Sequence, residues 1–411
     1  MPYYLLFLAF SLISLISLYL LDFKSFLQDL TIWSFALTLS LVQNFAPFLI
    51  LFAALLVLTM AYIDSDSIFL LFSAIIGLIG LAVCDDLLLL YLFIELTSLP
   101  FYVLAARERA GMLSSEAGVK YFILGALSSA ILLLGITIVY AEVGHTNIFL
   151  INNLYVPLII IAILFKFGAA PFHMWVPDVY DGAPTIVSSL FAIVPKFAFL
   201  FILVKFNIPS WLPFVAALSI AFPSVAAINQ SRIKRLLAYS AISHVGFLLL
   251  AVAANSLIGF QASFVYLIFY ALMSFVAWSI VLWSNYVFVA QFAGLSRFNP
   301  VLAFSFAATL LSFAGVPPFA GFFAKYLVLS AAVQADFVII PLFAVLASVL
   351  SAFVYIRLIV IMFFVDKSMV VVNNLVVPFK IAFSLAVSMF LIISVVLYPA
   401  VVFQFVFPLL V

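Results

Sequence analysis

Five ionisable side chains lie well inside long apolar runs of the chain, where a charge is costly. They are Glu95, Lys120, Lys166, Lys196 and Lys325. A lysine at the centre of a membrane span costs about 2.5–3.5 kcal/mol on insertion scales. Burial and a nearby carboxylate shift the proton affinity of an amine in opposite directions, so a buried lysine changes its protonation state when a neighbouring charge moves. This pattern predicts proton transfer within a membrane.

Residues that break helices accompany three of these lysines: Gly168 and Pro171 follow Lys166, Pro195 precedes Lys196, and Pro317 and Pro318 precede Lys325. A broken helix leaves backbone groups that water or protein must satisfy, so water is expected beside the charge. Two histidines, His173 and His244, lie in the same surroundings, and imidazole suits a proton relay because its unperturbed pKa is near neutral. A structural interpretation stays open for each residue, as a static pair, a side chain reaching the interface, or hydrogen-bonded packing.

The composition fixes the class of protein that must position these residues. Of the 411 residues, 69% are hydrophobic and 7% are charged, and the mean hydropathy is +1.44. A soluble domain carries about 25% charged residues. The apolar runs are continuous rather than alternating, which predicts helices and not barrel strands. We therefore expect an all-α, polytopic transmembrane helical bundle of about 13 helices.

Charged residues and loops divide the apolar runs into expected spans. These are 3–21, 44–63, 68–84, 87–106, 117–141, 154–176, 184–206, 211–230, 235–254, 257–284, 300–334, 337–364 and 379–407. Residues 30–43 could form an extra short span or an interfacial helix. The connections after every second span carry the lysines and arginines, such as Arg107, Arg232 and Arg235. By the positive-inside rule this basic face is the inner one, facing a cytoplasm or a mitochondrial matrix.

A short internal echo predicts a duplicated architecture. Residues 167–172 (FGAAPF) resemble residues 313–319 (FAGVPPF), and five spans separate equivalent points. An odd number of spans reverses the direction through the membrane, as in inverted repeats with broken helices. We expect N-terminal helices at 1–67, a first five-helix repeat at 68–209, a second, inverted five-helix repeat at 210–365, and a C-terminal helix at 366–411. Each repeat is expected to contain one discontinuous helix.

Several kinds of site are not expected in this chain. Cys84 is the single cysteine, which excludes a disulfide framework and a four-thiolate iron–sulfur cluster held by this chain alone. His145, His173 and His244 lack metal-ligand spacing, so no metal site is expected. No glycine-rich nucleotide-binding motif is present. No leader with a cleavage site precedes the first apolar run, and the net charge of +1 gives no case for binding nucleic acid.

Four blocks of sequence carry a resemblance. They are residues 93–100 (FIELTSLP), 119–122 (VKYF), 165–184 (FKFGAAPFHMWVPDVYDGAP) and 234–244 (KRLLAYSAISH). The chain resembles the antiporter-like membrane subunits of respiratory complex I over about residues 68–364, and is most similar to the subunit 2 type, called chain N in bacteria. Bacterial members of this type have fourteen spans and a longer N-terminal region.

The resemblance implies a proton-translocating subunit of NADH:ubiquinone oxidoreductase. It implies that Glu95 is the key carboxylate, paired with Lys120. Lys166 is the lysine of the first broken helix, Lys196 is the central relay, and Lys325 lies on the second broken helix near the exit. His173 and His244 match family histidines on or near the polar axis.

The resemblance also implies the partners. NADH, FMN, iron–sulfur clusters and ubiquinone are expected in partner subunits and not in this chain. The partners are other complex I membrane-arm subunits, including further antiporter-like subunits, and membrane lipids. The 49 phenylalanines and the missing leader favour a multi-pass protein of the mitochondrial inner membrane over one of the bacterial plasma membrane. Two alternatives stay open: an Mrp-type cation/proton antiporter subunit and a purely structural membrane subunit.

Overall fold

The computed structural model describes residues 45–60, 65–108, 111–151, 156–365, 377 and 379–397. The expected span at 3–21 and the apolar segment at 30–43 lie outside these residues. Within the described ranges every regular element is a helix. Eight of the described helices are long and apolar enough to cross a membrane. Each predicted span from 44–63 onward corresponds to a helix or to a broken pair of helices, although α6 is longer at both ends than its predicted span 117–141.

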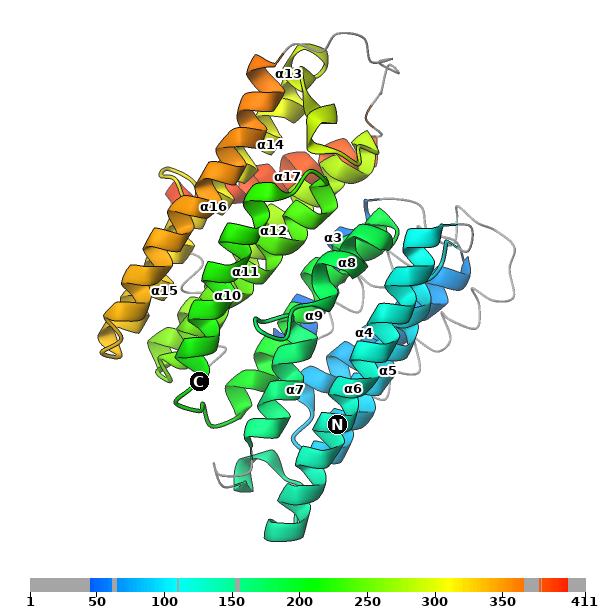
Figure 1. The fold of residues 1–411 in the computed structure, drawn as a ribbon, viewed down its shortest axis with the longest axis vertical. Helices are drawn as coiled ribbons and strands as arrows, with labels where there is room; N and C mark the ends of the chain where they lie inside the picture. Colours follow the sequence, from blue (N-terminus) through cyan, green and yellow to red (C-terminus); the bar gives the residue numbers. More distant parts are fainter. Residues whose placement is uncertain are drawn as a thin grey trace. The chain divides into compact units, whose positions relative to one another are not determined.

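The described chain forms two compact units. The first contains the described residues up to Ile163 and Gly182–Phe206, and the second contains Leu164–Asp181 and the described residues from Asn207 onward. The first unit is built from α3 (Phe45–Leu58), α4 (Ser65–Val83), α5 (Leu87–Ala105), α6 (Met112–Val143), the 3-10 helix η1 (Ile148–Leu150), the start of α7 (Pro157–Phe167) and α9 (Thr185–Lys205). Helices α4, α5 and α6 lie side by side, and α3 and α4 pack on the deeply buried α9 (Figure 1).

Local chemistry decides where the helices of the first unit begin and how closely they pack. Asp86 caps α5, because its Oδ1 accepts hydrogen bonds from the backbone N–H groups of Leu88 at 2.8 Å and Leu89 at 3.4 Å. A Cβ atom added at Gly80 of α4 would lie 2.3 Å from the ring of Phe93 of α5. The contact between α4 and α5 therefore depends on a residue without a side chain.

The first broken helix consists of α7 and α8 (Trp175–Gly182). Gly168 adopts φ +79° directly after α7, a conformation that glycine tolerates without strain. Side chains satisfy backbone groups that the break frees: Ser219 Oγ accepts from the N–H of Ala170 at 2.8 Å, and Trp175 Nε1 donates to the carbonyl of Phe165 at 3.0 Å. The predicted span 154–176 thus contains a break between two helices, and side-chain hydrogen bonds satisfy backbone groups at that break.

The second unit contains the remaining helices. They are α10 (Leu212–Ala226), η2 (Ala227–Asn229), α11 (Ile233–Ala253), α12 (Leu257–Ser284), η3 (Val289–Phe292), α13 (Leu295–Phe298), α14 (Pro300–Ala314), α15 (Ala320–Gln334), α16 (Ile339–Phe364) and α17 (Phe379–Leu397). Helices α11 and α12 are almost wholly enclosed, with α10 beside α11 and α16 beside α10 and α14 (Figure 1). The buried core of this unit therefore lies around α11 and α12.

The second broken helix is the α14–α15 pair. Gly315 ends α14 at φ +82°, and Ser312 Oγ accepts from the backbone N–H of Gly321 at 3.0 Å. A Cβ atom at Gly321 would lie 1.8 Å from the carbonyl oxygen of Ser312, so the two pieces approach as closely as backbones can. Residues 167–172 and 313–319, the two segments that share the short internal echo, therefore both lie in discontinuous helices, as the sequence predicts.

Candidate functional site

The predicted site residues divide between the two units. The first unit holds Glu95, Lys120 and Lys196, and the second holds Lys166, His173, His244 and Lys325. Each unit thus has a set of titratable side chains on its own helices.

Among the described residues of the first unit, Lys196 is the most enclosed amine. It follows Pro195 within α9, and only 4% of the residue is exposed. The helix that carries it packs against α3, α4 and α5. Phe191, earlier on the same helix, contacts the ring of Phe101 edge-on, with the centroids 5.0 Å apart. Lys196 therefore lies within an apolar core. An ionisable side chain in such a place either pairs with another group or serves a function such as proton transfer.

Glu95 and Lys120 are the other predicted residues of the first unit. Glu95 lies on α5, and its buried Oε1 has no hydrogen-bond partner within the described part of the chain. Lys120 forms an ion pair with Glu116, one helical turn earlier on α6, at 2.6 Å between Nζ and Oε1. The pairing of Lys120 with Glu95 stays a prediction.

Lys325 lies at the break of the α14–α15 pair in the second unit. Only 8% of the residue is exposed, and its Nζ donates to the carbonyl oxygen of Ala314 at 2.9 Å. Ala314 is the last residue of α14, and a regular helix would have used that carbonyl for its own ladder. The amine also lies over the face of Phe247, 5.1 Å from the ring centroid. The break therefore provides the polar ligand of a buried lysine.

His244 lies in the centre of α11, close to the same aromatic residues. Its Nδ1 shares a hydrogen bond with the hydroxyl of Tyr266 on α12, 2.6 Å away. The imidazole packs against Phe313, with the ring centroids 5.0 Å apart. Tyr266 stacks on Phe247, which is the ring beneath the Lys325 amine. His244, Tyr266, Phe247 and Lys325 thus follow one another through the core of the second unit.

Lys166 and His173 belong to the first broken helix. Lys166 lies in the last turn of α7 and is partly buried. His173 lies between α7 and α8, is 8% exposed, and packs on Phe222 of α10 with the ring centroids 4.7 Å apart. Its Nδ1 is buried without a hydrogen-bond partner among the described residues.

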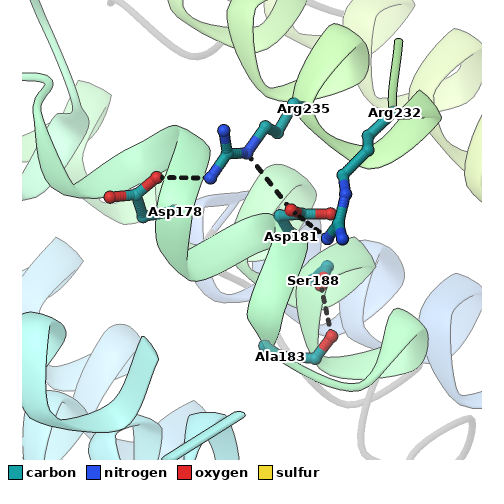
Figure 2. A network of polar contacts seen from close by, with 6 residues as sticks. All are labelled: Asp178, Asp181, Ala183, Ser188, Arg232 and Arg235. Carbon is teal, nitrogen blue, oxygen red and sulfur yellow. Dashed lines mark hydrogen bonds and ion pairs between the residues drawn. The ribbon is translucent and has the colours of Figure 1, made fainter. Parts of the chain in front are cut away.

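Figure 2 shows an ion-pair cluster that the sequence did not predict. Asp181 at the end of α8 binds both Arg232 Nη1 at 2.7 Å and Arg235 Nε at 3.1 Å, and Asp178 binds Arg235 Nη2 at 2.9 Å. The Asp181 side chain is 4% exposed. These pairs connect the second piece of the broken helix to the start of α11. In the first unit, Ser188 Oγ donates to the carbonyl oxygen of Ala183 at 3.3 Å, near the start of α9 (Figure 2).

Tyr266 was also missed from the sequence. It lies in an apolar helix, 22 residues from His244, and tyrosine is an ordinary core residue in such a helix. No local sequence motif predicts that the Tyr266 hydroxyl forms a hydrogen bond with an imidazole. The only available signal was the polar spacing of Ser240, Ser243 and His244 along α11, which marks the helix face that needs a polar partner.

Comparison with known proteins settles the family. The family model described as "NADH:quinone oxidoreductase/Mrp antiporter, TM" matches residues 84–351. The chain belongs to this family. NADH-quinone oxidoreductase subunit N of Pelagibacter ubique is 37% identical over 358 residues, which cover 80% of this chain and 73% of the relative. NADH-ubiquinone oxidoreductase chain 2 of Marchantia polymorpha is 36% identical over 352 residues, covering 75% and 72% respectively.

Two solved structures agree with this chain in fold. A chain of respiratory complex I from Thermus thermophilus with bound Aureothin matches with a TM-score of 0.88 and 29% identity, over 97% of this chain and 98% of that one. A chain of the Mrp complex from Dietzia sp. has a TM-score of 0.77 at 21% identity, covering 88% of this chain and 82% of that one, a likeness of fold alone. The predicted resemblance and the all-α, multi-pass membrane fold with discontinuous helices are confirmed. The functional roles of the individual residues and the domain boundaries stay predictions.

Proposed function

We propose that this chain is a proton-translocating membrane-arm subunit of an NADH:quinone oxidoreductase, of the subunit N or chain 2 type. The observation that carries the proposal is the buried amine of Lys325, bound by a carbonyl that the break in its helix releases. The family to which the chain belongs and the similarity of the chain to complex I support the same function. Other membrane-arm subunits are its partners, and quinone reduction takes place in them.

The contacts of Lys325 allow it to hold a proton and to release it. The single carbonyl of Ala314 and the face of Phe247 stabilise the ammonium form, while burial opposes it. The two effects act in opposite directions, so a change in nearby charge can alter the protonation state. The hydrogen bond between His244 Nδ1 and the Tyr266 hydroxyl lies next along the core, and it can pass a proton in either direction because either atom can donate.

Lys196, with Glu95 and Lys120, performs the same task in the first unit. Lys166 and His173 are the corresponding groups of the first broken helix. A charge that moves at Glu95 or Lys120 changes the proton affinity of the next amine by electrostatics, and this couples the steps of the relay. Redox chemistry in partner subunits supplies the energy that moves the first charge.

The chain contributes protein groups to this reaction and leaves the redox groups to its partners. With Cys84 as its single cysteine, it cannot supply four thiolates to an iron–sulfur cluster. NADH, FMN, the clusters and ubiquinone belong to partner subunits, and lipids cover the apolar helix faces. The mitochondrial inner membrane is the proposed location, and relatives include bacterial and mitochondrial proteins alike.

The function is tested by replacing Lys325 with methionine in the complete complex. Lys325→Met keeps the length of the side chain and removes the proton-binding group. We expect the complex to assemble and the ratio of protons translocated per electron to fall in proteoliposomes. Lys205→Met is the matched control. Lys205 is the last residue of α9, and its Nζ donates to the carbonyl oxygen of Cys84 and to Oδ1 of Asp85, in the loop between α4 and α5. An unchanged ratio in Lys325→Met would refute the proposed function.

An Mrp-type cation/proton antiporter subunit is the second candidate, because the family model covers both kinds of protein. Copurification separates the two: the complex I subunit stays with an NADH-oxidising, quinone-reducing complex, whereas the antiporter subunit does not. A purely structural subunit would tolerate Lys325→Met without loss of proton translocation, so the experiment above also tests that alternative.

A further inference from the structure

Ser312, in the last turn of α14, uses its hydroxyl differently from the two other hydroxyl residues of that helix. Ser305 and Thr309 each donate to a carbonyl three residues earlier in α14, at 2.9 and 2.7 Å. Such a bond within the same helix is the usual one for these residue types. The fully buried Ser312 Oγ instead donates to Met273 Sδ on α12, at 2.8 Å. A thioether is a weak acceptor, so a second partner must favour this orientation of the hydroxyl.

The second partner of Ser312 is the backbone N–H of Gly321, which donates to Ser312 Oγ at 3.0 Å. Gly321 is the second residue of α15, where a backbone N–H has no acceptor within its own helix. The residue at the N-cap usually accepts from this group, but the N-cap of α15 is Phe319, whose side chain forms no such bond. Ser312 therefore caps α15 from the other side of the break.

This cap lies beside the buried amine of the second unit. Lys325 is four residues after Gly321, so the two lie on the same face of α15. The Lys325 amine donates to the carbonyl oxygen of Ala314, two residues after Ser312, at 2.9 Å. The cap and the bond between amine and carbonyl thus both join the last turn of α14 to the first turns of α15. A movement of α15 that broke the cap would also take the amine away from its carbonyl.

The bond from Ser312 to Met273 fixes the break relative to α12, which packs against both α14 and α15. Met273 is 1% exposed. It lies about two turns after Tyr266, so the two side chains share one face of α12. Tyr266 is the partner of His244 Nδ1. The hydroxyl of Ser312 therefore connects the break that binds the lysine with the helix that binds the histidine.

We infer that Ser312 is a positioning residue for Lys325. Its hydroxyl holds the two pieces of the second broken helix where the amine reaches the carbonyl of Ala314, and it keeps both pieces in register with α12. The inference rests on the proposed function for what Lys325 does. Ser312 itself transfers no proton, because its single hydroxyl proton points to Met273 Sδ and the oxygen accepts from a backbone N–H.

The cap is tested by hydrogen exchange of the peptide that contains Gly321, measured in the intact complex. Ser312→Ala removes the acceptor, and we expect the Gly321 amide to exchange at least about fivefold faster, as the loss of one hydrogen bond predicts. Thr309→Val is the matched control, because Thr309 is equally buried on the same helix and bonds within it. Unchanged exchange in Ser312→Ala overturns the inference.

The positioning role is tested by the proton-to-electron ratio in proteoliposomes, compared at equal quinone reductase activity. We expect Ser312→Ala to lower the ratio and Thr309→Val to leave it unchanged. The double variant of Ser312→Ala with Lys325→Met should pump no worse than Lys325→Met alone, since residues that act as a unit are non-additive. A residue that only stabilised the fold would add its own loss. That result, or a normal ratio in Ser312→Ala, overturns the inference.

Met273→Leu is the second variant, for the case that Ser312→Ala does not assemble. It nearly conserves the volume of the core and removes the acceptor that orients the Ser312 hydroxyl. We expect faster exchange at Gly321 and a lower ratio than in Met362→Leu, the control at an equally buried methionine of α16. A Met273→Leu complex that matches this control in both measurements overturns the inference. The proposed function stands if Lys325→Met lowers the ratio, and it is refuted if that ratio is normal.

Discussion

At the scale of single residues, the hydrogen bond between His244 and Tyr266 is the contact best placed to pass a proton. Tyr266→Phe removes the hydroxyl at 2.6 Å from Nδ1 and keeps the ring stacked on Phe247. We expect proton transfer through the second unit to slow by about a hundredfold, the lower end of what a positioned proton-transfer group contributes. The measurement is the proton-to-electron ratio in proteoliposomes that contain the complete complex.

A matched control for this change is Tyr140→Phe, because Tyr140 lies on the exposed face of α6. Equal amounts of assembled complex in both variants separate a loss of proton transfer from a loss of folding. Normal pumping by Tyr266→Phe would show that His244 uses another partner for its proton.

Asp86 provides a residue-scale prediction for the dependence of stability on pH. Burial tends to raise the pKa of this carboxyl, but hydrogen bonds from Thr146 Oγ1 at 2.6 Å and from the backbone N–H groups of Leu88 and Leu89 outweigh it, so the pKa is lowered. A lowered folded-state pKa gives stability that is present above the ordinary aspartate pKa of about 4 and is lost as the pH falls through the lower value.

We therefore expect the loop between α4 and α5 to loosen only under strongly acidic conditions, and hydrogen exchange of residues 84–90 measures this. Asp86→Ala removes the cap and is expected to destabilise the start of α5 by about 1 kcal/mol at neutral pH. In that variant the acid-induced increase in exchange should disappear. If it persists, another carboxyl is responsible.

At the scale of elements, the cluster of Asp178, Asp181, Arg232 and Arg235 holds α8 against α11. Asp181→Asn removes the buried charge that two arginines share. We expect a loss of about 1.5–3 kcal/mol, the range for hydrogen bonds to charged groups. Thermal unfolding of the purified complex measures it, and Asp178→Asn, with one arginine partner, should cost less.

A double-mutant cycle with Asp181→Asn and Arg232→Gln distinguishes a specific pairing from general packing. We expect the double variant to lose less stability than the sum of the two single losses, because either single change already breaks the ion pair that the two residues share. A double loss equal to that sum would mean that the two charges do not depend on each other.

Elements were the features most readily predicted from sequence, and their contacts the least. Long apolar runs predicted the spans, because the thickness of the bilayer sets the length of a spanning helix. Gly168 with Pro171, and Pro317 with Pro318, predicted the two breaks, because the interior of a regular helix rarely tolerates glycine and proline together. The Asp181–Arg232 and Ser240–Tyr355 contacts join residues 51 and 115 positions apart. Such pairings depend on which helices become neighbours, and no local pattern in a single sequence records that.

At the scale of the whole molecule, the two sets of titratable residues are proposed to serve one relay. Lys196 belongs to the first unit and Lys325 to the second, and each is buried in its own core. If a translocated proton must occupy both amines in turn, removing either one stops the same process. The double variant Lys196→Met with Lys325→Met should then pump no worse than the weaker single variant, since residues that act as a unit are strongly non-additive.

The measurement compares the proton-to-electron ratios of the two single variants and the double variant in complexes of equal quinone reductase content. Two independent paths would give losses that add, with the double variant clearly below either single one. Lys205→Met again serves as the control, because its amine binds loop residues rather than the core of either unit. Additive losses would leave two separate proton sites in this subunit and would remove the reason to treat its two units as one pump.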